Sequence, residues 1–498
     1  MKARNIEKTE GQKRMKLVSK QIFLNSVACL TLGWLMRSGE IDKMLPEASL
    51  GDKFRMEQGL EIGNRSRQAF GVGVLVNDIN LTSAAQRTAN LMSDPKVSVI
   101  FEGTFLVDNM AAKADVLKRT GRTSWQLTEV KSSANDKSEF IDDMAYTLMV
   151  AARCGVPISK VTLMLVSKDF RLGMGNDKLF VEIEHTDEVQ QRAALFEPLL
   201  QQIEEKTRSS TMPPPEVVFE CRQCPIFEQC AGQGVKNHIF DIPRISKAKF
   251  EELKRQGFLC IENIPDGFSL TDNQEIVRQC VKTKKARVGN ELKTQLASIR
   301  FPAYYLDFET VMTALPLYPN IAPYTQLPTQ YSIHQCSAVG KVTNHYEYLS
   351  DPSFDSRRDL ANQLIKDIGK VGSVIAYSSF EKTIINKLAR EFPEMSAELA
   401  LIADRIVDLN SIVSKSVYHP DFHGSTSIKV TLPVFAPELS YGDLNIRDGD
   451  SAVVTFAYLA LGRLTGKEAE TAKRNLLSYC ERDTLAMVEL HKQLFSLV

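Results

Sequence analysis

The chain has 498 residues, of which 43% are hydrophobic and 24% are charged, as is usual for a globular protein of two or three domains. Lysine plus arginine and aspartate plus glutamate both number 61, so no net charge favours nucleic acid, although a local basic groove can coexist with acidic metal sites. The sequence shows neither a signal-peptide pattern nor a run of 18 apolar residues. We therefore expect a cytoplasmic protein without membrane spans.

The first half of the chain alternates between helical and extended patterns. An amphipathic helix carrying Cys29 is expected at 22–36, and a helix leading into a strand at 54–75. Further helices are expected at 81–91 and 142–154, and strands at 97–101, 105–107, 114–117, 125–131 and 161–166. This alternation predicts an α/β domain with a mixed sheet flanked by helices.

A hairpin in this half carries two acids and a lysine. Glu129 and Lys131 are two residues apart and therefore share a strand face, and Asp115 can reach the same place across the turn. Two acids can hold a divalent cation, and a lysine beside it can polarise the attacking water. Glu102 is a further candidate ligand, and Asp108 is a rival to Asp115 as the first acid. A salt-bridged surface strand shows the same short pattern.

This Asp…Glu-x-Lys arrangement resembles the PD-(D/E)XK nuclease superfamily. The resemblance implies a restriction-endonuclease-like N-terminal domain in which Asp115, Glu129 and Lys131 are catalytic, and in which the acids and Glu102 hold a metal ion. The helix after Lys131 carries Tyr146 but lacks the glutamine that the family usually offers to the site. This departure leaves open a domain that keeps the fold around a degenerate centre.

Three of the nine cysteines, Cys221, Cys224 and Cys230, crowd together after this domain. In a reducing compartment such a group indicates metal binding rather than disulfides, with buried core cysteines as the alternative. Together with the early Cys29, the group resembles the iron–sulfur staple of RecB-like nucleases, which include the CRISPR-adaptation nucleases. That resemblance implies a [4Fe–4S] cluster held by these four cysteines. Four thiolates also suit zinc, which stays an alternative.

The segment 236–300 reads as a helical connector with helices near 250–257, 271–283 and 292–299. It is locally basic, with Lys282, Lys284, Lys285, Arg287 and Lys293. Such a cluster of cations is typical of a helix face exposed to solvent. The alternative is a surface that binds the phosphates of a nucleic acid.

The second domain is expected at 301–498, and it opens on a strand that carries two acids. Asp307 and Glu309 are separated by one aromatic residue, so both project from one strand face. Such close carboxylates repel each other unless a cation lies between them, and their hard oxygens suit Mg²⁺ or Mn²⁺. Two exposed acids on a surface strand are the alternative. Further strands are expected at 329–334, 345–349 and 373–377, and helices at 357–368, 382–390 and 472–494.

Three later residues complete an ordered set with these acids. Glu381 stands at the start of a helix, while Tyr479 and Asp483 lie four apart on one face of the last helix. Asp408 is a second candidate for the place of Glu381, and the strand histidines His334 and His345 are expected to be structural.

The order and spacing of this set resemble the DnaQ-like (DEDD) 3′–5′ exonucleases, in the branch with a tyrosine before the last acid. The resemblance implies an RNase H-like mixed sheet in which Asp307, Glu309, Glu381 and Asp483 hold two Mg²⁺ or Mn²⁺ ions and Tyr479 orients water. The family usually has aspartate where this chain has Glu381. Three stretches of this half also resemble a bacterial family in which an iron–sulfur RecB-like nuclease is fused to such an exonuclease: Ser427 through Tyr441, Asp448-Gly449 and 479–484.

Together the two resemblances imply a bacterial fusion, with a RecB-like nuclease domain at 1–235, the connector at 236–300 and a DnaQ-like exonuclease at 301–498. The expected function is metal-dependent hydrolysis of phosphodiester bonds, on DNA rather than RNA, in phage defence or DNA repair. The alternatives are a nucleic-acid-binding scaffold with degenerate nuclease centres and an RNA-processing exonuclease. The sequence names no protein partner.

Overall fold

The structure is a computed structural model that describes residues 15–498; residues 1–14, on which the expected lack of a signal peptide depends, lie outside the described part. The chain divides into two compact units. The first unit consists of Met1–Glu47 and Met56–Gly234, and the second of Ala48–Arg55 and Val235–Val498. Among the described residues, no helix is long and apolar enough to cross a membrane.

The first unit is built on a six-stranded mixed sheet in the order β1-β2-β3-β4-β5-β6. Strands β2 to β4 form an antiparallel meander, β5 runs parallel to β4 after a helical crossover, and β6 is antiparallel to β5. Strand β1 pairs in parallel with β2. The bounds are β1 Val74–Leu75, β2 Val99–Val107, β3 Met110–Arg119, β4 Trp125–Lys131, β5 Ile158–Val166 and β6 Phe180–Glu184.

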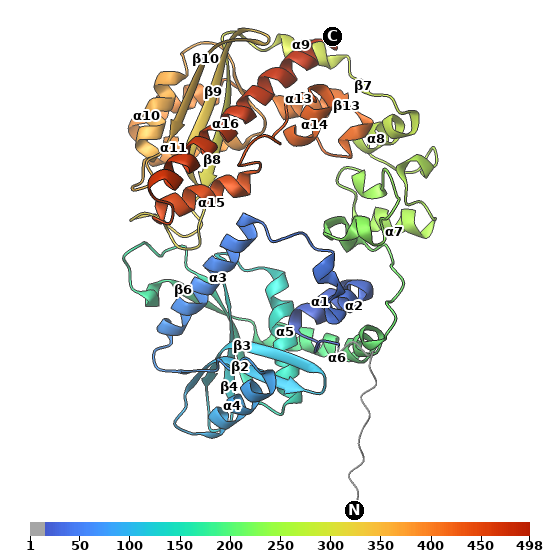
Figure 1. The fold of residues 1–498 in the computed structure, drawn as a ribbon, viewed down its shortest axis with the longest axis vertical. Helices are drawn as coiled ribbons and strands as arrows, with labels where there is room; N and C mark the ends of the chain where they lie inside the picture. Colours follow the sequence, from blue (N-terminus) through green and yellow to red (C-terminus); the bar gives the residue numbers. More distant parts are fainter. Residues whose placement is uncertain (1–14) are drawn as a thin grey trace, which may run out of the picture. The chain divides into compact units, whose positions relative to one another are not determined.

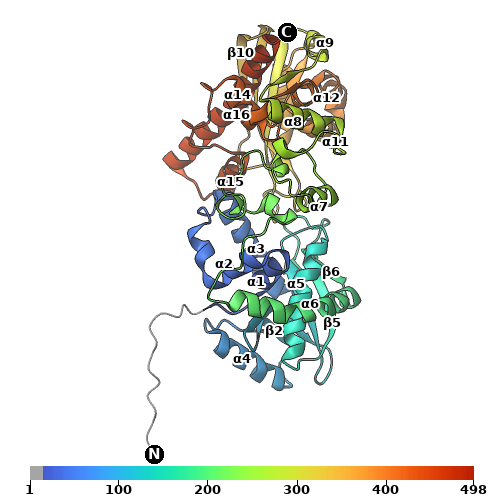
Figure 2. The same cartoon turned by 90° about the vertical axis from the view of Figure 1, so that its right-hand side faces the viewer.

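Six helices accompany this sheet, and α5, the crossover between β4 and β5, is its central packing partner. Helices α1, α5 and α6 pack on one another (Figure 2), and Phe23 of α1 contacts both Tyr146 and Phe196 with ring centroids 5.1 Å apart. The bounds are α1 Lys20–Ala28, α2 Leu30–Ser38, α3 Leu50–Ala69, α4 Leu81–Ser93, α5 Ser138–Arg153 and α6 Thr186–Arg208.

The single helix expected at 22–36 is wrong. The chain breaks at Cys29, which has an extended backbone with φ −155° and ψ 112° and separates α1 from α2. The thiol of Cys29 accepts a hydrogen bond from the Leu32 amide at 3.4 Å, as an N-cap does for the first turn of α2. The break places Cys29 at the start of a helix, whereas the apolar repeat of the sequence predicts no break there.

The second unit begins with the segment expected to be a connector. It contains α7 Lys247–Arg255, α8 Asp272–Thr283, β7 Arg287–Val288 and α9 Glu291–Ala297. Strand β7 pairs with the short β13 (Val417–Tyr418), and the Gly289 amide donates to the Ser416 carbonyl at 2.6 Å. These bonds tie the segment to the C-terminal part of the chain.

The main sheet of the second unit has five strands in the order β10-β9-β8-β11-β12. Strands β8, β9 and β10 form an antiparallel meander, whereas β11 and β12 run parallel to β8 on its other side. The bounds are β8 Ala303–Val311, β9 Leu327–Ala338, β10 Lys341–Leu349, β11 Val374–Ala376 and β12 Ile406–Asp408.

The two faces of this sheet differ in character. On one face, Leu306 and Phe308 join a core with residues of α10 (Arg357–Asp367), α11 (Phe380–Glu391) and α12 (Ser396–Ala403). The long helix α16 (Gly466–Phe495) packs along β8 and β9 on the other face, where it is drawn in dark red in Figure 1. That contact combines an apolar cluster with buried hydrogen bonds: Gln330 donates to the Leu476 carbonyl at 2.7 Å, and Tyr305 hydrogen-bonds His491 at 2.6 Å.

Three more helices complete the unit: α13 Leu409–Ser416, α14 Ile428–Phe435 and α15 Gly449–Ala460. Helices α14 and α15 pack on α16. The mixed α/β class expected from the sequence is confirmed in both units, because each unit has a mixed sheet with helices packed on it.

Candidate functional site

Four acids of the second unit gather where β8, β11 and α16 meet. Carboxylate oxygens of Asp307, Glu309 and Asp483 all lie within 4.8 Å of one another. Glu381 interacts electrostatically with both Asp307 and Glu309. We call these four residues the acid cage. The structure thus brings three of the four carboxylates that the sequence predicts to mutual ligand distance, with Glu381 close enough to raise the pKa of Asp307 and Glu309.

The local sequence explains how each acid reaches the cage. In β8 the side chains alternate, so Asp307 and Glu309 face α16 while Leu306 and Phe308 enter the apolar core on the other face. On α16, Asp483 is buried one turn after Tyr479, and the thiol of Cys480 approaches Asp307 Oδ2 at 3.6 Å. The alternation of side chains along β8 and the helical repeat of α16 therefore direct these acids to the same place.

Glu381 comes from the first turn of α11, directly after β11, and is only 3% exposed. Asp408, the alternative for this place, ends β12 and caps α13 by accepting the Ser411 amide at 2.9 Å. Asp408 also adds negative potential at Glu381. These acids stand at the carboxyl ends of neighbouring parallel strands, the edge at which open α/β sheets bind ligands.

The cage holds more negative charge than its surroundings compensate. Burial, followed by the charges of Asp483, Glu381 and Glu309, raises the pKa of Asp307 well above its ordinary value. Burial also raises the pKa of Glu309 to about 8, of Glu381 to about 7 and of Asp483 to about 6. Buried carboxylates without a compensating cation are unfavourable, so this donor set fits hard divalent cations such as Mg²⁺ or Mn²⁺.

Two groups beside the cage were not assigned a role from the sequence. Lys429 of α14 donates to the Tyr479 hydroxyl at 3.2 Å, and its charge offsets part of the rise in pKa that burial causes at Glu309 and Asp483. Tyr441 donates to Asp483 Oδ1 at 2.6 Å. Lys429 is the second residue of α14, and no local pattern in the sequence indicated its role beside the cage.

The acids of the first unit differ from those of the acid cage in their partners, because Glu129 and Asp143 form ion pairs with lysines. Lys20 at the start of α1 pairs with Glu129 at 2.6 Å, and Lys131 pairs with Glu129 at 2.9 Å and with Asp143. Burial alone raises the pKa of Glu129, but these two lysines outweigh it and the pKa is lowered. Lys20 and Asp143 were not anticipated from the sequence.

Asp115 lies close to this group, accepting the Val130 amide at 2.6 Å, and burial followed by the charge of Glu129 raises its pKa to about 7. Glu102 adds negative potential at Asp115 but pairs with Arg67 at 3.1 Å. Among the described residues, no three of the first unit's acids approach within 4.8 Å as those of the acid cage do.

Two other residues of this half lie apart from the group. Asp108, the rival first acid, is an exposed turn residue that faces Arg153 at 3.6 Å. Tyr146 points into the core, where its hydroxyl donates to the Val18 carbonyl at 2.6 Å.

The four cysteines predicted to bind a cofactor lie in mutual electrostatic contact. Burial, followed by the approach of Cys29, Cys224 and Cys230, raises the pKa of the Cys221 thiol. In the described part of the chain, however, no three cysteine sulfurs lie within 4.8 Å of one another.

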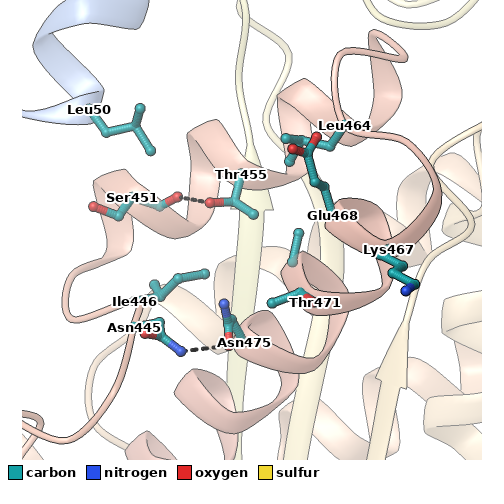
Figure 3. A pocket seen from close by; sticks show the side chains of 11 residues that line it. Leu50, Asn445, Ile446, Ser451, Thr455, Leu464, Lys467, Glu468, Thr471 and Asn475 are labelled. Carbon is teal, nitrogen blue, oxygen red and sulfur yellow. Dashed lines mark hydrogen bonds between the residues drawn. The ribbon is translucent and has the colours of Figure 1, made fainter.

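A surface pocket of about 740 Å³ lies on α15 and the first half of α16 (Figure 3). Asn445 donates to Asn475 at 3.1 Å at its edge, and Asn475 stands one helical turn before Tyr479. The pocket also presents the hydroxyls of Ser451, Thr455 and Thr471 and the ammonium of Lys467.

Comparison with known proteins identifies relatives without a described activity. Residues 304–427 match a family described as a domain of unknown function, DUF2779. The uncharacterized protein MG366 of Mycoplasma genitalium is 24% identical over 223 residues, which are 41% of this chain and 33% of that protein. The uncharacterized protein UU173 of Ureaplasma parvum is 26% identical over 236 residues, 42% of this chain and 33% of that protein.

This chain therefore spans about a third of the length of the curated relatives it matches. The matched family segment contains Asp307, Glu309 and Glu381, and it ends before Lys429 and Asp483.

Proposed function

We propose that this protein is a metal-dependent nuclease whose second unit hydrolyses phosphodiester bonds from the 3′ end of DNA. The observation that carries the proposal is the convergence of Asp307, Glu309 and Asp483 within 4.8 Å, with the buried Glu381 beside them. Two divalent ions, when bound by these acids, would supply a clamp for the attacking and leaving oxygens of an in-line displacement at phosphorus.

The topology of the second unit supports an RNase H-like domain of the DnaQ class. An antiparallel meander of β8, β9 and β10 is extended on the other side of β8 by the parallel strands β11 and β12. The acids follow this topology, with two on β8, one after β11 and one on α16. Their order along the chain is the order expected of that family.

The residues around the cage have roles in holding the substrate and water. Lys429 places a positive charge beside the Tyr479 hydroxyl, which makes that hydroxyl a better donor to a water or a phosphate oxygen. Tyr441 and Tyr479 both hydrogen-bond the carboxylate of Asp483, Tyr441 through Oδ1 at 2.6 Å, and so orient this acid toward the cage. The pocket lined by Asn445 and Asn475 offers amides to the bases of a strand that enters the cage.

Replacing Lys429 with Met should lower kcat by about 10- to 1000-fold with a smaller change in KM, because a charge that acts on the reacting phosphate is lost. Single-turnover rates on a 3′-labelled oligonucleotide measure this effect. The matched control is Lys473→Met, which removes an exposed lysine of α16 that pairs with Glu470 at 3.0 Å. Equal rates for both variants would show that Lys429 has no part in the reaction.

The direct test of the proposed function is digestion of single-stranded DNA and RNA of matched sequence, labelled at either end, with Mg²⁺, with Mn²⁺ or with EDTA. We expect metal-dependent release of nucleotides from the 3′ end, faster on DNA. Faster digestion of RNA would favour the RNA-processing alternative. Binding of both polymers without cleavage under any metal condition would favour the scaffold.

For the first unit we propose a RecB-like PD-(D/E)XK domain whose centre comprises Asp115, Glu129 and Lys131. The β-β-β-α-β order of β2 to β5 and the convergence of these side chains support it. The pairing of Lys20 with Glu129 means that a cation already occupies the place of a metal ion, so binding would require Lys20 to withdraw. This competition favours a weaker second centre.

We also propose that Cys29, Cys221, Cys224 and Cys230 hold a [4Fe–4S] cluster, because Cys29, Cys224 and Cys230 all act electrostatically on the Cys221 thiol. Protein purified anaerobically should contain iron, with little zinc. Cys221→Ser should lose the iron, whereas the control Cys154→Ser, a change of a separate half-buried cysteine in the same unit, should retain it. One equivalent of zinc and no iron would contradict the cluster.

A further inference from the structure

A second group of metal-ligating side chains lies in the second unit, apart from the acid cage. His334 of β9, His345 of β10 and Glu481 of α16 offer ligand atoms that all lie within 4.8 Å of one another. His334 and His345 are directly paired across the antiparallel strands, so their rings project from the same face of the sheet. The ring centroids are 4.5 Å apart, and the planes are tilted by 32°.

Hydroxyl groups behind the rings fix their orientation. His334 Nδ1 lies 2.8 Å from the Thr484 hydroxyl, and His345 Nε2 lies 2.9 Å from the Ser332 hydroxyl. These two hydroxyls are themselves 2.8 Å apart. Each ring thus bonds a hydroxyl through one nitrogen and has its second nitrogen available for a metal ion, Nε2 in His334 and Nδ1 in His345. Metal-binding histidines in proteins are commonly oriented by a hydrogen bond of this kind.

We propose that His334, His345 and Glu481 bind one first-row transition metal ion of the Zn²⁺ class. Two imidazoles and one carboxylate suit zinc, cobalt, nickel or ferrous iron, whereas Mg²⁺ prefers oxygen ligands only. Glu481 is exposed, so water can fill the remaining coordination positions of the ion.

The position of the site gives the metal ion a structural consequence. Strand β10 is the edge of the sheet, and a bound ion would join it to β9 and to α16. Glu481 lies two residues before Asp483, which on a helix turns the two side chains to different sides. The ion would therefore hold α16 in place without sharing ligands with the acid cage. This proposal does not depend on nuclease activity.

Cobalt titration of the full-length protein tests the site. The Asp307→Asn/Glu309→Gln variant is the background, so that the acid cage does not take up the ion. We expect one equivalent of Co²⁺ with visible d–d bands but no near-ultraviolet thiolate band, together with paramagnetically shifted imidazole N–H proton signals. Zinc should displace it.

In the same background, His345→Gln and Glu481→Gln should weaken this binding at least about 10-fold, as loss of a ligand does. The matched control His419→Gln changes a loop histidine and should bind as the background does. Both test residues are partly or fully exposed, and Glu481→Gln on its own keeps the test valid if His345→Gln fails to fold. Unchanged affinity in Glu481→Gln and His345→Gln, or a thiolate band that accounts for all bound cobalt, would overturn the proposal.

Discussion

Replacing Asp307 with Asn and Glu309 with Gln together should lower the rate of 3′-end nucleotide release by at least about 1000-fold, which corresponds to about 4 kcal/mol of transition-state stabilisation. The two side chains supply adjacent charged oxygens to the acid cage. The amides keep the shape of both side chains but not the charge that holds divalent ions. The measurement is a single-turnover assay with saturating Mg²⁺ or Mn²⁺ on 3′-labelled DNA.

The assay requires two controls. Glu129→Gln should be present in both the test and the reference protein, so that the proposed centre of the first unit does not contribute. Glu347→Gln, which neutralises an exposed acid on β10, should leave the rate unchanged. If the double variant with Glu129→Gln still digests DNA at the reference rate, the acid cage is not a nuclease centre.

The sequence was most informative where one local repeat decides the position of a side chain. The strand repeat of two predicted that Asp307 and Glu309 share a face, and the helix repeat of four predicted the same for Tyr479 and Asp483; β8 and α16 confirm both. The strand at 125–131 is β4 with the same bounds. Such features depend on neighbours in sequence, and for that reason a single chain is enough to predict them.

Contacts between segments that are distant in the sequence could not be predicted from local repeats. Lys20 reaches Glu129 across 109 residues, and Lys429 reaches Tyr479 across 50. A lone lysine near a helix start is typical of solvated surfaces, so neither had a local signal of its chemistry. Cys29 was placed inside a continuous helix because apolar periodicity persists through it, whereas the thiol cap on α2 decides the break.

The strand histidines show the same limit. His334 and His345 stand eleven residues apart, and only the hairpin register brings them face to face. Glu481 joins them from a helix that is more than 130 residues further along the chain. The structural role expected of both histidines, drawn from each residue considered alone, stays a prediction.

The stability of the metal-free second unit should fall by a few kcal/mol as the pH rises from about 6.5 to 8.5, because the acid cage is forced to ionise. The pKa of Glu309 is raised to about 8 and that of Glu381 to about 7, above the ordinary carboxyl value near 4.5. The folded state therefore binds more protons than the unfolded state in this window. The stability from these acids is fully present below pH 4.5 and is lost as the pH rises through the folded values.

The pH range from about 6.5 to 8.5 separates the effect of the acids on stability from that of the buried histidines. The pKa values of His238, His334 and His491 are lowered to about 4 by burial, so these groups make stability rise with pH, but only between about pH 4 and 6.5. Asp115 of the first unit has a raised pKa of about 7 and acts in the same direction as the cage. Because Asp115 is present both in the wild type and in the Asp307→Asn/Glu309→Gln variant, its contribution cancels when the two proteins are compared.

Urea unfolding in EDTA, followed across this pH range, measures the effect. The wild-type midpoint for the second unit should fall with pH, while that of the double variant should fall less, since its amides carry no charge to repel the remaining acids. Adding Mn²⁺ at pH 8 should restore the wild-type midpoint and leave the variant nearly unchanged, because a ligand stabilises only the state that binds it. Parallel pH profiles for the two proteins would mean that the four carboxylates do not repel one another, and a shared pair of metal ions would then lose its physical basis.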